Sequence, residues 1–287
     1  MRKTILTALA CLLTLAVSAQ DKPAYRIFTS EGDGTDYGIM LKTLSKADVI
    51  FIGETHNCPV AHWLEYEIAS DIAERHPKGL VLGAEMFETD NQILVDEYVS
   101  GLISSDKFEA EAKLWDNHYT DYAPLLYLAR DMKIPFVATN VPRRYASFVK
   151  DNGLEALETL SDEAKKLMAP LPIAFDESLE DNEMFGFMAM MGGHGAESHY
   201  AEAQALKDAT MAWSIAENFD RKFIHFNGNY HSDSNGGIIP YLSTYLPGKK
   251  IVTVCCVRQD EIDRLDKENH GRADFVVCVP VEMTMTF

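Results

Sequence analysis

A carboxylate and an imidazole, Glu54 and His56, stand two positions apart directly after a continuous apolar segment. That segment, Val49-Ile50-Phe51-Ile52-Gly53, is typical of a strand buried on both faces. Side chains that follow such a strand lie at its carboxyl end, where open α/β sheets bind their ligands. A carboxylate and an imidazole together can bind a divalent metal or act as general acid and base. His62, on the helix that follows, is expected at the surface or behind this site.

Three more apolar segments, 80–84, 136–139 and 222–227, are also followed by polar side chains. Because the carboxyl ends of parallel strands meet at one edge of a sheet, we expect these side chains to converge on one crevice. Arg143 could hold a ligand carboxylate, such as a propionate, through two parallel hydrogen bonds. The expected ligand-binding residues are Glu54, His56, Glu85, Asn140, Arg143 and His231.

The elements that position these residues alternate between strand and helix. This alternation predicts an α/β fold with a mostly parallel sheet flanked by helices, which strands 251–255 and 274–279 complete. Residues 143–212 show helical patterns only, and they predict a smaller inserted all-helical subdomain over the sheet edge. The α/β domain is then expected to comprise residues 20–142 and 213–287.

Residues 1–19 are predicted to be a signal peptide. Arg2 and Lys3 precede an apolar stretch, and Val17-Ser18-Ala19 is a small-residue cleavage site. The stretch is too short to span a bilayer, and no later segment approaches that length. We therefore expect an exported, periplasmic protein. A lipid anchor at Cys11 is the less favoured alternative, because few apolar residues precede that cysteine.

The 287 residues are 47% hydrophobic and carry a formal charge of -18. This size and apolar content suffice for a large core, and the acidic balance argues against a nucleic-acid partner. Four cysteines follow the predicted signal peptide: Cys58, Cys255, Cys256 and Cys278. An oxidising compartment would permit disulfides, but small buried thiols are the favoured interpretation, and no CxxC pattern indicates zinc.

The helical insert holds further candidate ligands. Met188 and Met191 belong to a methionine-rich helical pattern, and His194, His199 and Tyr200 follow it. Haem needs an apolar slot, an axial ligand such as His, Tyr or Met, and a cation near its propionates. These five residues are candidate haem contacts. The alternative is an ordinary helix core followed by a solvated loop.

Five short motifs carry a family resemblance: Gly53-Glu54-Thr55-His56, Glu85-Met86-Phe87, Asn140-Val141-Pro142-Arg143, Asp208-Ala209-Thr210-Met211-Ala212 and Gly228-Asn229-Tyr230-His231. Over residues 45–245 the chain resembles the ChaN-like haem-binding uptake family. The resemblance implies a parallel-sheet domain, a smaller helical domain, haem binding and possible dimerisation around haem. More distant similarity to TraB/Tiki-type metalloproteases and erythromycin-esterase-like hydrolases implies importance for the acid and histidine positions. Asn229 and Tyr230 depart from the small residues expected before His231.

Three functions stay open at this point. The favoured hypothesis is an exported protein of haem or iron uptake that binds haem, or another small ligand, without turnover. The alternative is a metal-dependent hydrolase, esterase or protease-like, in which a divalent metal on Glu54, His56, Glu85 and His231 activates water. The third is a signalling or scaffold protein with a vestigial crevice. A homodimer is compatible with the first hypothesis.

Overall fold

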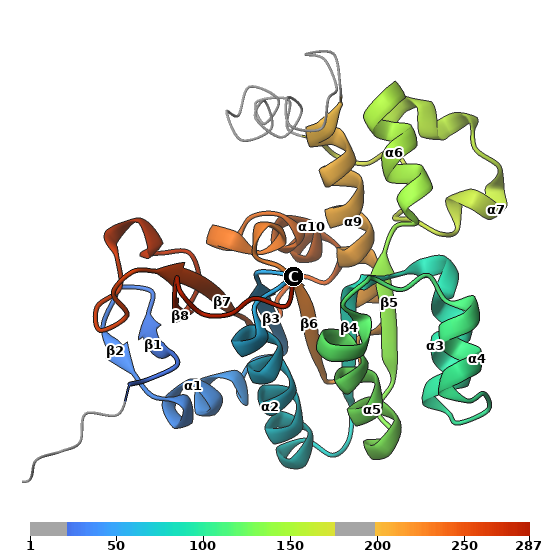
Figure 1. Cartoon of the computed structure of the whole chain (residues 1–287). Coiled ribbons are helices and arrows are strands. Elements are labelled where there is room, and N and C mark those ends of the chain that lie inside the picture. The colour runs from blue at the N-terminus through green and yellow to red at the C-terminus, as the bar shows by residue number, and fades with distance from the viewer. Residues whose placement is uncertain (1–21, 176–198) are drawn as a thin grey trace, which may run out of the picture.

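The computed structural model describes residues 22–175 and 199–287, and Figure 1 shows a central sheet with helices on both sides. The sheet has eight strands in the order β2-β1-β8-β7-β3-β6-β4-β5. The strands are β1 (Arg26–Thr29), β2 (Gly34–Thr35), β3 (Val49–Glu54), β4 (Leu80–Glu88), β5 (Phe136–Asn140), β6 (Lys222–Gly228), β7 (Ile251–Gln259) and β8 (Phe275–Pro280). The predicted α/β class and mostly parallel sheet are confirmed.

The strands from β8 to β5 in this order are all parallel to their neighbours, whereas β1 runs antiparallel to β8 and to β2. Strand β3 lies between β6 and β7, with Ile50 opposite both Ile224 and Val252. Every residue of β3 is buried, as its continuous apolar sequence predicts. The edge pair β1 and β2 was not expected. Its strands are so short that only Ile27 and Phe28 are buried, which leaves almost no sequence pattern.

One face of the sheet is covered by α1 (Tyr37–Leu44), α2 (Pro59–Arg75), α3 (Gln92–Val99), α4 (Ser105–Glu111) and α5 (Ala123–Met132). Helix α2 begins with Pro59 at its first position, where the missing N–H costs no hydrogen bond. Its residues Leu64, Ile68 and Ile72 follow at helical spacing and are buried in the core beneath the sheet. This packing fixes which face of α2 points inward.

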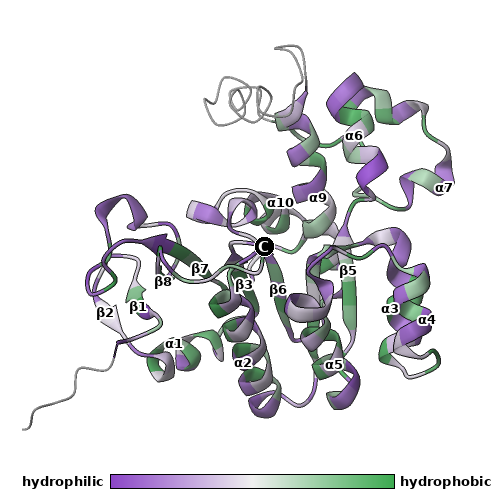
Figure 2. Ribbon diagram, in the orientation of Figure 1, coloured by the Kyte–Doolittle hydropathy of each residue, from purple (hydrophilic) through white to green (hydrophobic). Residues whose placement is uncertain are grey.

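The other face is covered by α9 (Tyr200–Asn218) and α10 (Ile238–Tyr245). Met211 and Ile215 of α9 pack with Leu242 of α10 against Phe51 and Phe223 of the sheet. Figure 2 shows the resulting pattern, with green hydrophobic strands inside and purple hydrophilic segments outside. Among the described residues, no helix is both long enough and apolar enough to cross a membrane.

A second, helical group stands above the carboxyl edge of the sheet in Figure 1. It consists of α6 (Arg143–Asn152), a 3-10 segment (Leu154–Thr159), α7 (Asp162–Lys165) and the start of α9, and it has an apolar cluster of its own around Val149, Leu157 and Leu206. The predicted insert begins at the first residue of α6. Its predicted end at residue 212 falls inside α9, because this helix continues from the helical group onto the sheet. The domain limits stay predictions, and the predicted signal peptide lies outside the described residues.

Candidate functional site

A pocket of about 630 Å³ lies at the carboxyl edge of β3, β4, β5 and β6. Helices α6 and α9 form its other wall, so the pocket lies between the sheet and the helical group. All six side chains expected from the strand ends line it: Glu54, His56, Glu85, Asn140, Arg143 and His231. They meet because their strands are parallel neighbours that end at the same edge.

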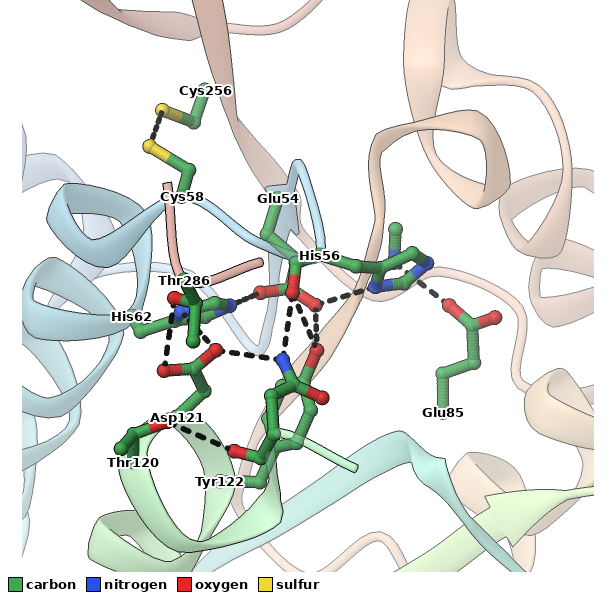
Figure 3. A network of polar contacts seen from close by, with 12 residues as sticks. Glu54, His56, Cys58, His62, Glu85, Thr120, Asp121, Tyr122, Cys256 and Thr286 are labelled. Atoms are coloured by element: carbon green, nitrogen blue, oxygen red, sulfur yellow. Dashed lines mark hydrogen bonds and ion pairs between the residues drawn. The ribbon is translucent and has the colours of Figure 1, made fainter. Parts of the chain in front are cut away.

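Glu54 is the last residue of β3 and only 1% of it is exposed. His56 Nδ1 donates to Glu54 Oε1 over 2.7 Å, and the Tyr122 hydroxyl donates to the same oxygen over 2.8 Å (Figure 3). Burial raises the pKa of Glu54, but the contacts with His56 and His62 outweigh it, so its pKa lies below the ordinary value. The Trp115 ring packs edge-on against the His56 ring, with centroids 4.8 Å apart. Glu54 is therefore an anion that holds His56 in one orientation.

The second half of the site joins β4 to the segment after β6. The β4–β5 register shifts between Ala84 and Glu88, and Glu85 lies within this irregularity. Gly228 N donates to Glu85 Oε2 over 2.7 Å, and His231 Nε2 lies 3.1 Å from Glu85 Oε1. These contacts connect two neighbouring parallel strands at their ends.

Asp208 of α9 completes this half, because its Oδ1 contacts His231 Nδ1 at 2.5 Å. Burial lowers the pKa of His231, but the charges of Glu85 and Asp208 outweigh it and raise the pKa to about 10. Burial also raises the pKa of Glu85, yet the charge of His231 outweighs it and brings the pKa below its usual range. His231 is therefore a buried imidazolium between two acids. Asp208 was not among the side chains expected in the site, although an acid among the buried residues of an amphipathic helix is a usable signal.

Two glycines allow the backbone to approach these side chains. A Cβ atom at Gly228 would lie 2.7 Å from His56 Nε2, and one at Gly53 would lie 2.7 Å from Asn229 Oδ1. Asn229 uses its amide to pair with the backbone of Cys256 in β7, donating to the carbonyl over 2.7 Å. Asn229 therefore connects the loop after β6 to the sheet by hydrogen bonds. This role explains why position 229 holds a polar residue where a small one was expected.

The candidate haem residues of the helical insert are separated by the structure. Tyr200, at the first position of α9, lines the pocket at the sheet edge. His199 does not; its ring contacts Glu202, and it lines a different pocket beside Leu154 and Ile173. Met188, Met191 and His194 lie outside the described residues.

The predicted metal ligands Glu54, His56, Glu85 and His231 form two separate carboxylate–histidine pairs. His231 has both ring nitrogens against carboxylate oxygens, which leaves neither nitrogen for a metal in this arrangement. The four-ligand metal site, and the hydrolase that depends on it, stay predictions. Within the described residues, Cys58, Cys255, Cys256 and Cys278 are buried and free, in line with the favoured interpretation.

Comparison with known proteins agrees with the fold. Residues 40–242 match the model of a protein family described as haem-binding uptake, Tiki superfamily, ChaN. Among solved structures, "Cofacial heme binding to ChaN of Campylobacter jejuni" is similar with a TM-score of 0.67 and 17% identity, over 88% of this chain and 96% of that chain. No curated protein gave a significant match.

Two further structures show weaker similarity. A Bacillus cereus protein has a TM-score of 0.49 and 12% identity over 84% of this chain and 90% of its own. A mutant of the erythromycin esterase EreC in its open conformation has a TM-score of 0.46 and 12% identity, over 81% of this chain and 77% of that chain. The family match covers well over half of the chain, and this chain belongs to the ChaN family of haem-binding uptake proteins in the Tiki superfamily.

Proposed function

We propose that this protein binds haem in the pocket at the carboxyl edge of the sheet, under the helical group, and serves haem or iron uptake. The observation that carries the proposal is the composition of this one pocket, which combines an axial donor, apolar walls and cations. Its volume of about 630 Å³ falls within the range of about 300–1,000 Å³ for small-molecule sites.

The side chains present fit a haem group. Val141, Ala146 and Ala203 give the pocket apolar surface, and Trp115 and Tyr230 add aromatic rings. Apolar and aromatic surface of this kind suits a porphyrin ring, which is flat and largely apolar.

The polar groups of the pocket fit the two ends of the ligand. Arg143, Lys150 and Lys207 bring cations to the pocket of an acidic protein, and such cations suit the two propionates. Among the described residues, Arg143 takes part in no ion pair, whereas its neighbour Arg144 is paired with Asp90. Arg143 is therefore available for a ligand carboxylate.

Tyr200 is the residue that would hold the iron. Its phenol is one of the oxygen donors that proteins use for haem, and it lines the helical wall of the pocket. Bound haem would supply an iron centre that accepts one or two axial donors. His56, fixed by Glu54 and Trp115 on the sheet side, would face the bound ligand from the other wall.

Export to the periplasm is part of the proposal and rests on Arg2, Lys3, the apolar stretch and the small residues before Gln20. Cell fractionation with sequencing of the mature N-terminus tests this part. We expect a chain that begins at Gln20 in the periplasmic fraction, and a cytosolic chain that retains Lys3 would contradict it.

Haemin titration tests the proposed ligand. We expect a Soret shift that saturates near one haem per chain in the wild-type protein. A shift that rises linearly without saturation would contradict a specific site. Light scattering on the same samples tests the predicted homodimer, which is expected to form only when haem is present.

A further inference from the structure

A second group of polar side chains lies behind Glu54, on the side away from His56. His62 and Glu65 stand three residues apart on α2, so both side chains project from one face of that helix. This face points into the core, where Glu65 is 0% and His62 is 5% exposed. In Figure 3, Glu54 lies between His56 on one side and His62 on the other.

Several buried atoms of this group have no hydrogen-bond partner. Neither carboxylate oxygen of Glu65 has a hydrogen-bond partner among the described residues. Glu54 Oε2 and His62 Nε2 contact each other, and His62 Nδ1 contacts Asp121, but none of these three atoms has hydrogen-bond geometry. Buried polar atoms are nearly always hydrogen-bonded, so a fully buried carboxylate without a hydrogen bond is a candidate ligand for an ion. One donor atom from each of the three residues lies within 4.8 Å of the other two, which is close enough for all three to reach one ion.

Glu54 and Glu65 lie close together in the core, which disfavours a negative charge on both. Among the described residues, no lysine or arginine pairs with Glu54 or Glu65. Burial, and then the charges of Glu54 and Asp121, raise the pKa of Glu65 well above its ordinary value. The raised pKa favours the protonated form of Glu65, and a divalent cation bound between Glu65 and the Glu54 anion would displace that proton.

The surroundings of His62 match those of a metal-binding histidine. Its Nε2 faces the Glu54 carboxylate, while its Nδ1 lies 3.2 Å from Asp121 Oδ2, near but not aligned for a hydrogen bond. Metal-bound histidines typically donate their second ring N–H to a carboxylate, and Asp121 is the carboxylate beside Nδ1 of His62. Asn117 Nδ2 donates to the same Asp121 oxygen over 2.6 Å and holds that carboxylate in place.

We infer that Glu54, His62 and Glu65 bind one divalent transition-metal ion behind the wall of the pocket. The site is distinct from the proposed haem pocket, which neither His62 nor Glu65 lines, and the two share only the Glu54 carboxylate. Two carboxylates and one imidazole suit Zn²⁺, Mn²⁺ or Fe²⁺. The imidazole disfavours Mg²⁺ and Ca²⁺, which take oxygen ligands. The ion would fix the Glu54 side chain and, through it, the orientation of His56.

The test uses untagged full-length protein stripped with EDTA and titrated with Zn²⁺ and Mn²⁺ by calorimetry, with thermal unfolding measured in parallel. We expect the wild type to bind one equivalent of at least one of these ions and to unfold at a higher temperature when loaded. Glu65→Gln keeps the shape of the side chain but removes a ligand, and it should weaken binding by at least about 100-fold. Glu74→Gln, an exposed change on the same helix, is the matched control and should bind like the wild type.

A wild-type protein that binds neither ion would overturn the inference, as would a folded Glu65→Gln variant with wild-type affinity. Binding of Mg²⁺ as tight as that of the transition metals would also overturn the inference. If Glu65→Gln does not fold, His62→Asn replaces it under the same criteria. Haemin should still saturate near one equivalent in Glu65→Gln, with a lower affinity because His56 is held less firmly, since Tyr200 and Arg143 of the pocket are unchanged. Calorimetry therefore reports failure of the metal site, and the haemin titration separately reports failure of haem binding.

Discussion

His231 Nε2 lies 3.1 Å from Glu85 Oε1, although the two residues come from opposite halves of the chain. Strands β4 and β6 are parallel neighbours, so their carboxyl ends bring Glu85 and the segment after β6 together. Asp208 closes the chain of contacts from α9, the helix that also carries Tyr200. One set of charged contacts therefore ties the sheet edge to the helix that forms the opposite wall of the pocket.

This relationship predicts how stability depends on pH. The pKa of His231 rises from 6.5 in the unfolded chain to about 10 in the fold, so its contribution is complete below pH 6.5 and is lost as the pH rises towards 10. The pKa of Glu85 is lowered from 4.5, so its contribution is present above pH 4.5 and is lost on acidification. Urea unfolding from pH 4 to 10 should show that the difference in unfolding free energy between wild type and His231→Gln shrinks above about pH 6.5. The control is His270→Gln, a change at an exposed histidine. If the difference in unfolding free energy between wild type and His231→Gln does not change with pH, this assignment is contradicted.

Gly228 is required by the position of His56. An alanine there would place its Cβ 2.7 Å from His56 Nε2 and 2.8 Å from Cε1. We expect Gly228→Ala to destabilise the fold by about 1–3 kcal/mol through overpacking and to weaken haemin binding, because the ring of His56 must move. Gly34→Ala is the control, since nothing lies within 4 Å of its Cβ position. Equal stability and haemin affinity in the two variants would show that His56 is not held as described.

The Tyr122 hydroxyl supports Glu54 from the core. Tyr122 is 1% exposed, and its hydroxyl donates to the Glu54 carboxylate over 2.8 Å. Tyr122→Phe removes a buried hydrogen bond to a charged group and should lower the free energy of unfolding by about 1.5–3 kcal/mol in urea. Tyr66→Phe, on the exposed side of α2, should cost almost nothing. A Tyr122→Phe variant as stable as Tyr66→Phe would mean that Glu54 does not depend on this contact.

Arg143 and Arg144 form a natural pair of variants for the propionate contact. Arg143 lines the pocket, whereas the Arg144 guanidinium contacts Asp90 and does not line it. Loss of one charge-assisted hydrogen bond in Arg143→Ala should raise the haemin dissociation constant by about tenfold or more. Arg144→Ala should leave it near the wild-type value. Similar affinities for the two variants, measured by Soret titration, would remove Arg143 from the site.

The sheet and the strand-end residues could be predicted from the sequence because their signals are local. Val49 to Gly53 is a continuous apolar run that suits only a buried strand, and the geometry of parallel sheets then brings the strand ends together. Glu85 and His231 were found in this way without any knowledge of their partners. The short strands β1 and β2 gave no such signal.

The side chains contributed by helices were harder to predict. Whether His62 or Asp208 points inward depends on how α2 and α9 pack against the sheet. This packing cannot be predicted from the local sequence pattern. His199 and Tyr200 show the same limit, because they are neighbours in sequence and yet line different pockets. The orientation of the helix, and not the residue type, therefore decides which of these two neighbours lines the pocket at the sheet edge.

The most direct test of the proposed function compares haemin-loaded Tyr200→Phe with His199→Asn by absorption and electron paramagnetic resonance spectroscopy. Tyr200 lines the pocket and His199 lines another one, so the two variants alter adjacent residues with opposite expectations. We expect Tyr200→Phe to lose the wild-type Soret band and ferric spectrum, and His199→Asn to retain both. An unchanged spectrum in Tyr200→Phe, or its loss in His199→Asn, would contradict a haem held by Tyr200 at the carboxyl edge of the sheet.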